Sequence, residues 1–95
     1  MFVVILKYKK SIDLMDKFRP IHLEFLDVQY KNKTFIMSGR QNPMLGGVII
    51  ANCNSKDELW SILKQDIFYK ESLVDYEITE FNPNKMINGL SDLIK

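Results

Sequence analysis

The 95-residue sequence has little of several residue types, with one cysteine, one histidine, one tryptophan and four glycines. A single cysteine, Cys53, excludes an intramolecular disulfide and fits a reducing compartment. One histidine and one cysteine form no ligand-spaced cluster, so the sequence offers no metal site. The longest apolar run, Met1–Leu6, is far too short to span a bilayer and carries no signal-peptide pattern. We therefore expect a cytoplasmic protein without a metal.

The charges are nearly balanced, with 13 basic and 12 acidic side chains. This balance provides no overall field that would attract nucleic acid or an anionic membrane. The turn Gly46-Gly47 lacks the spacing and the trailing lysine of a phosphate-binding loop. With 46% hydrophobic and 26% charged residues, the chain is typical of one folded domain. We therefore expect neither nucleic acid nor a membrane as a partner.

Four segments rich in β-branched and aromatic residues predict strands. They are residues 2–8, 34–39, 47–52 and 73–81. Proline favours the first helical turn, so Pro20 predicts a helix from about Arg19 to Asn32, with 11–17 as a connector or a single helical turn. Ser55 and Glu58 fit a capping box that begins a second helix. Pro83 then introduces a helical tail over 84–95, after a domain that covers 1–83.

The order strand-helix-strand-strand-helix-strand predicts an α+β fold, the ferredoxin-like βαββαβ plait with an antiparallel four-stranded sheet. Its two helices cover one face of the sheet only. Yet the strands over 2–8 and 47–52 are apolar on both faces, which is typical of a sheet that is covered on both sides. A second copy of the chain could cover the open face, giving a homodimer and possibly a higher oligomer. Alternatively, the tail could fold back over that face.

His22 falls on the apolar face of the first predicted helix. Its stripe contains Phe18, Ile21, Phe25, Val28 and the polar Gln29. An imidazole facing a core loses about 1–3 kcal/mol for each unsatisfied polar group. Histidine is also the side chain most suited to exchange a proton near neutral pH. His22 is therefore the best candidate for acid/base chemistry.

Asp66 follows Leu59, Ile62 and Leu63 at helical spacing, at the end of the second apolar stripe. Two helices that lie side by side on a sheet could bring Asp66 to His22. A carboxylate bonded to one ring nitrogen would fix the tautomer and leave the other nitrogen free to move a proton. Alternatively, Asp66 only caps the short turn over 67–70.

Three further residues are candidates for substrate binding. Ser38 is placed by strand alternation on the face of Thr34 and Ile36, where it could donate a hydrogen bond. Gly39 would let a ligand approach the backbone. Arg19 could bind a carboxylate with both arms of its guanidinium. Alternatively, Ser38 is merely a tolerated strand serine, and Arg19 is a surface residue.

Five short motifs together resemble the YciI-like (YCII-related) family over residues 1–83. They are residues 19–26 (RPIHLEFL), 38–39 (SG), 46–49 (GGVI), 66–68 (DIF) and 76–81 (YEITEF). The resemblance implies a dimeric α+β barrel, in which two plaits pack sheet to sheet. It also implies an active site whose His–Asp dyad maps onto His22 and Asp66, with Ser38 close by.

The chain departs from the family pattern at two positions. Ile67 stands where proline often follows the aspartate, so the helix could run on and re-aim Asp66. Arg40 stands where proline commonly follows Ser-Gly, which adds a charge near the expected pocket.

A relative in this family removes chloride from a chlorinated hydroxyhydroquinone. The resemblance therefore implies a cofactor-free lyase, of dehydrohalogenase or isomerase type, that acts on a small molecule. The alternative is a non-catalytic ligand-binding or regulatory dimer. Haem-degrading and cofactor-free oxygenases share the barrel, but their histidine lies on the second helix, where this chain has none. The substrate and the pathway are not encoded in any motif.

Overall fold

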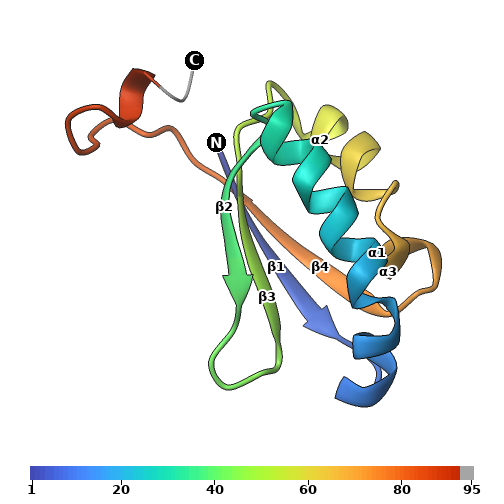
Figure 1. Ribbon diagram of the computed structural model, residues 1–95. Coiled ribbons are helices and arrows are strands. Elements are labelled where there is room, and N and C mark those ends of the chain that lie inside the picture. Colours follow the sequence, from blue (N-terminus) through green and yellow to red (C-terminus); the bar gives the residue numbers. More distant parts are fainter. Residues whose placement is uncertain (93–95) are drawn as a thin grey trace.

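The computed structural model describes residues 1–92 of the chain. In chain order its elements are β1 (Phe2–Tyr8), α1 (Ile12–Lys31), β2 (Phe35–Arg40), β3 (Gly46–Ala51), α2 (Lys56–Leu63), α3 (Ile67–Lys70), β4 (Val74–Glu80) and a 3₁₀ turn η1 (Leu90–Asp92). The strands form one antiparallel sheet in the order β2-β3-β1-β4. All three α-helices lie on the same face of this sheet (Figure 1). The predicted ferredoxin-like α+β fold is therefore confirmed.

The core lies between the sheet and the helix layer. On β1, alternate side chains point into it, and Phe2, Val4 and Leu6 are buried. Leu59 and Leu63 of α2 are fully buried opposite them. Each of the four predicted strands ends within one residue of its observed bounds. The β-branched and aromatic composition of these segments was a sufficient signal for their positions.

The first helix begins about seven residues earlier than the sequence predicts. Ser11 caps it, and its hydroxyl accepts a hydrogen bond from the backbone N–H of Leu14 at 3.3 Å. Met15 in the added turns is fully buried. Pro20 lies inside the helix and provides no N–H for the carbonyl of Asp16, a defect that costs about 3 kcal/mol in a helix interior. Burial of the preceding turns outweighs that cost, so the predicted connector over 11–17 is wrong.

A β-bulge in β2 decides which way its last residues point. The pairing with β3 shifts by one residue between Phe35 and Met37. Phe35 therefore faces the helix layer with its partner Ala51, and after the bulge Ser38 faces the same layer with its partner Ile49. A one-residue shift moves all following side chains to the other face. Simple alternation, which placed Ser38 on the face opposite to Phe35, was wrong for this reason.

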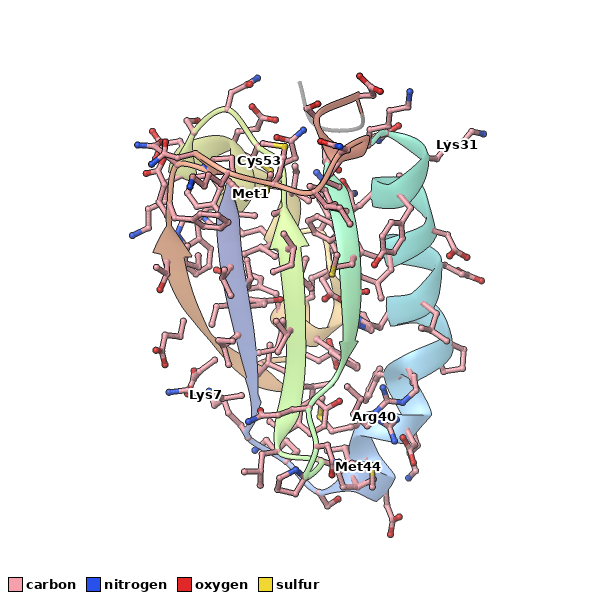
Figure 2. All side chains as sticks on the ribbon, turned by 90° about the vertical axis from the view of Figure 1, so that its left-hand side faces the viewer. Met1, Lys7, Lys31, Arg40, Met44 and Cys53 are labelled. Atoms are coloured by element: carbon pink, nitrogen blue, oxygen red, sulfur yellow. The ribbon has the colours of Figure 1, made fainter. Side chains whose placement is uncertain are left out.

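The opposite face of the sheet is not covered by any described segment (Figure 2). After β4 the chain leads away from the sheet, at the end opposite to the β2–β3 hairpin (Figure 1). The predicted tail helix is not formed over 84–89, and η1 is the single helical turn in the described part of the tail. The remaining predicted tail positions, 93–95, lie outside the described residues. Within residues 1–92, no helix is both long and apolar enough to cross a membrane.

Candidate active site

His22 and Asp66 contact each other in the interior between α1 and α3. The Nδ1 atom of His22 lies 2.9 Å from Oδ1 and 2.8 Å from Oδ2 of Asp66. An ionised carboxylate can only accept, so Nδ1 carries the hydrogen in this pair. The imidazole also stacks on the ring of Phe68, with centroids 4.0 Å apart and planes inclined by 7°. Two contacts of different kinds therefore fix the orientation of the ring.

Asp66 reaches His22 from a helix cap and not from a helix face. The helix α2 ends at Leu63, and Asp66 is the N-cap of α3, where its Oδ1 accepts the backbone N–H of Phe68 at 3.1 Å. Its side chain is fully buried. Both roles considered for Asp66 are thus present together, because a carboxylate has several acceptor sites. Ile67 does not extend α2 through Asp66.

A cavity of about 190 Å³ lies between α1 and the β2–β3–β1 part of the sheet. Its walls include His22, Arg19, Ser38, Gly39, Arg40 and Tyr8. Among residues 1–92, Tyr76 Oη is the one buried side-chain oxygen or nitrogen without a hydrogen-bond partner. The hydrogen bonds of His22 use Nδ1, and Nε2 is not among the buried atoms that lack a partner. Nε2 is therefore accessible, and it is open to the cavity that His22 lines. The cavity therefore presents one ring nitrogen that is free to exchange a proton.

Ser38 lies on the β2 wall of the cavity, and its hydroxyl hydrogen bonds to that of Tyr30 on α1. Either oxygen can donate this bond. Gly39 beside it also borders the cavity, and a Cβ added there would meet no atom within 4 Å. The two hydroxyls give this wall of the cavity a hydrogen-bond donor, and Gly39 leaves open space next to it.

Arg19 lies one helical turn from His22, on the same side of α1. Its Nε donates to Oδ1 of Asp16 at 3.0 Å, and its Nη2 donates to the hydroxyl of Tyr8 at 3.4 Å. Arg40, on the opposite wall, places Nη2 3.7 Å from the same Asp16 oxygen. The predicted candidates Arg19, His22, Ser38 and Gly39 thus border one cavity, and Asp66 stands behind the histidine.

Tyr76 is a titratable group close to the pair that is not suited to acid/base work. Burial, with Asp66 and Tyr69 nearby, raises the pKa of Tyr76 well above its ordinary value, so its phenol stays protonated. Its ring packs against those of Trp60 and Tyr69. Tyr76 therefore forms part of the apolar support behind α3.

Two residues of the site were not singled out from the sequence: Tyr8, which lines the cavity, and Tyr30, which hydrogen bonds to Ser38. Tyr8 has the same strand parity as the buried Leu6, a signal that could have placed it inside. Tyr30 on α1 contacts Ser38 on β2, and no spacing rule in the sequence predicts that contact. Within the described residues, no three His, Cys, Asp or Glu side chains lie close enough together to hold a metal ion.

The fold and the cavity define a class, the α+β plait proteins with a His–Asp pair under a sheet-lined pocket. Within that class, residues 1–82 match the model of the YCII-related domain, and the chain belongs to this family. No curated protein matches the sequence. Among solved structures, it is similar to 5-chloro-2-hydroxyhydroquinone dehydrochlorinase (TftG) from Burkholderia phenoliruptrix AC1100, in complex with 2,5-dihydroxybenzoquinone. The two share 18% identity and a TM-score of 0.71 over 86% of this chain and 94% of that chain, which shows a common fold.

Proposed function

We propose that this protein is a cofactor-free enzyme of lyase (dehydrohalogenase) or isomerase type that acts on a small molecule. His22 is the general acid/base, and Asp66 positions it. The observation that carries the proposal is the asymmetry of the imidazole, with Nδ1 held by a buried carboxylate and Nε2 open to the cavity. A fixed tautomer with one free nitrogen is the arrangement that general acid/base catalysis requires.

In the proposed reaction, Nε2 removes a proton from a substrate carbon or hydroxyl. In the elimination, the electron pair of the broken bond forms a new double bond, and the halide leaves with the electron pair of its own bond to carbon. In the isomerisation, that pair forms a new double bond while a neighbouring double bond opens, and the His22 imidazolium returns its proton to the carbon at the far end. The imidazolium that forms is stabilised by the negative charge of Asp66. Ser38 and Tyr30 supply a hydrogen bond to the oxygen on which charge develops. Gly39 and Arg19 complete the substrate-binding wall.

The similar protein supports the elimination variant, since it is a dehydrochlorinase of a hydroxylated ring, in complex with a quinone. The cavity of about 190 Å³ is smaller than the roughly 300–1,000 Å³ of pockets for drug-sized ligands, which favours a substrate of few atoms.

The working unit in this proposal is a homodimer that forms through the open face of the sheet. Val3 and Ile5 of β1, with Val48 and Ile50 of β3, form an apolar patch on the central strands. The salt bridge of Lys7 with Glu77 borders this patch toward β4. One self-complementary surface is enough for a two-fold dimer, and burial of an apolar patch stabilises it. A cytoplasmic location belongs to the same proposal.

The test is chloride release from 5-chloro-2-hydroxyhydroquinone and from a panel of small halogenated hydroxy-ring compounds, each with the wild type and with His22→Gln. We expect turnover by the wild type and a loss of about 10²–10⁴-fold in kcat for His22→Gln. The matched control is Gln29→Ala, since Gln29 is buried on the same face of α1 but lies outside the cavity.

Unchanged turnover in His22→Gln would overturn the catalytic role of the histidine. The alternative is a ligand-binding or regulatory dimer. A compound that binds in the cavity, perturbs His22 and is recovered unaltered after long incubation would favour that alternative.

A further inference from the structure

The chain contains two arginines among its 13 basic residues, and both border the cavity that holds His22. The remaining basic residues are lysines, and none of those within residues 1–92 lines this cavity. Arginine presents a planar fork of donors that matches a carboxylate with two parallel hydrogen bonds, whereas lysine is a compact point charge. The placement of both forks at one cavity indicates recognition of a planar anion.

Each wall of the cavity carries one arginine and one residue of the proposed reacting site. On α1, Arg19 lies three residues before His22, about 4.5 Å along the helix axis. On β2, Arg40 lies two residues after Ser38 on the same strand face, about 7 Å along the strand. His22 and Ser38 form an inner pair on the two opposite walls, and Arg19 and Arg40 form an outer pair on the same two walls. Figure 2 shows Arg40 beside Met44, at the end of β2 and next to the N-terminal half of α1.

The outer pair is not neutralised by its surroundings. Asp16 is the one carboxylate that contacts either arginine among the described residues, at 3.0 Å from Arg19 and 3.7 Å from Arg40. The second distance is longer than a hydrogen bond. Arg40 otherwise donates to the sulfur of Met44, which is a weak acceptor. Two guanidinium groups against one carboxylate leave a net positive charge and several N–H donors at the cavity.

Asp16 also indicates which anion the pair accepts. A single carboxylate oxygen already lies within 4 Å of both guanidinium groups. A carboxylate of the substrate would find the same two donors and could use both of its oxygens. Asp16 itself is half-exposed, with 52% of its side chain accessible, so it can turn toward solvent when a ligand enters.

We propose that Arg19 and Arg40 bind a carboxylate of the substrate at the outer end of the cavity, so that the substrate class is small carboxylic acids. The reacting carbon would lie about 4.5–7 Å from that carboxylate, at the level of His22 and Ser38. This inference rests on the proposed function for the identity of the reacting site, and adds Arg40 and the anionic group. Arg40 is the residue that departs from the proline of the family pattern.

The test compares benzoate with benzamide, two probes of nearly the same shape of which only benzoate is charged. Binding is followed through the imidazole resonances of His22, which are unambiguous because the chain has one histidine. We expect the wild type to bind benzoate about tenfold or more tightly than benzamide, which corresponds to one charge-assisted contact. Arg40→Met should lose this preference, and Arg40→Lys should retain part of it. Lys17→Met removes one positive charge from α1 outside the cavity and should leave the preference intact.

Equal binding of the two probes by the wild type would overturn the proposal, as would no detectable binding of benzoate. A preference that survives in Arg40→Met, or that falls equally in Lys17→Met, would also overturn it. Inorganic phosphate is the second competitor, and stronger competition by phosphate than by benzoate would reject the carboxylate assignment. The readout needs no turnover, and His22→Gln should keep the benzoate preference when it is followed on backbone amides. Failure of the catalytic proposal and failure of the anion site are therefore distinguishable.

Discussion

The carboxylate of Asp66 lies within 2.9 Å of His22 Nδ1 through both of its oxygens, and the same side chain caps α3 through the N–H of Phe68. One buried residue thus connects the geometry of a helix start to the orientation of the imidazole. The ring of Phe68, in the first turn of that short helix, stacks on the face of the imidazole. Position and orientation of His22 therefore depend on the loop between α2 and α3.

Asp66→Asn separates the charge of this residue from its capping role. Asparagine also caps helices well, so we expect α3 to remain folded. The imidazolium loses its anionic partner, and kcat should fall about 10²–10⁴-fold. ¹⁵N chemical shifts of His22 should show loss of the single Nδ1–H tautomer. Asp27→Asn, on the exposed face of α1, is the matched control; equal activity of the two variants would contradict the role given to Asp66.

Gly46→Ala tests the close approach of β3 to β1. A Cβ at this position would lie 1.7 Å from the carbonyl oxygen of Leu6, a clash with backbone inside the sheet. We expect the free energy of unfolding to fall by about 1–3 kcal/mol or more. Gly39→Ala is the control, because its Cβ would meet no atom within 4 Å. Urea denaturation measures both, and similar losses in the two variants would contradict the clash.

Strand positions were predictable from the sequence because β-branched and aromatic residues concentrate in each strand and are sparse between them. The start of α1 was not, since Pro20 has a strong local preference and the burial of Met15 that overrides it is a tertiary effect. The face of Ser38 was also hidden, because a bulge is a property of the pairing between β2 and β3. The helical tail over 84–95 was predicted from Pro83 and from helical spacing, and neither signal tells whether the tail has a surface against which to pack.

In the candidate site, too, the residues were predictable from the sequence, whereas the way they are brought together was not. His22 was found because a histidine in an apolar stripe is rare, although the stripe itself is rotated: Ile21 and Val28 are half-exposed, while His22 and Gln29 are buried. Asp66 was found from helical spacing, although α2 ends three residues before it. The contact depends on how α1 and α3 pack, and a sequence contains that information only through the fold.

Cys53 should react slowly despite being the single thiol. It is 7% exposed, and burial, with Glu58 nearby, raises the pKa of Cys53 from 9.0 to about 11. A raised pKa favours the neutral thiol, so the nucleophilic thiolate forms only as the pH approaches 11. At pH 8 we expect alkylation by iodoacetamide to be roughly 100-fold slower in the folded protein than in urea, from the thiolate fraction alone. Comparable rates before and after unfolding would show that Cys53 is not protected.

Ile50→Glu tests the proposed dimer through the open sheet face. Ile50 lies on β3 among the apolar residues of that face, opposite Val3 of β1 and Met37 of β2. A carboxylate there would be desolvated without a partner on dimer formation, which costs several kcal/mol. We expect a dimer for the wild type and a folded monomer for the variant, by light scattering after size-exclusion chromatography. Val28→Glu introduces the same charge at a half-exposed apolar residue of α1, on the helix side, and should leave the dimer intact. A wild type that is monomeric at micromolar concentration, or a dimer that survives Ile50→Glu and dissociates with Val28→Glu, would place the interface elsewhere.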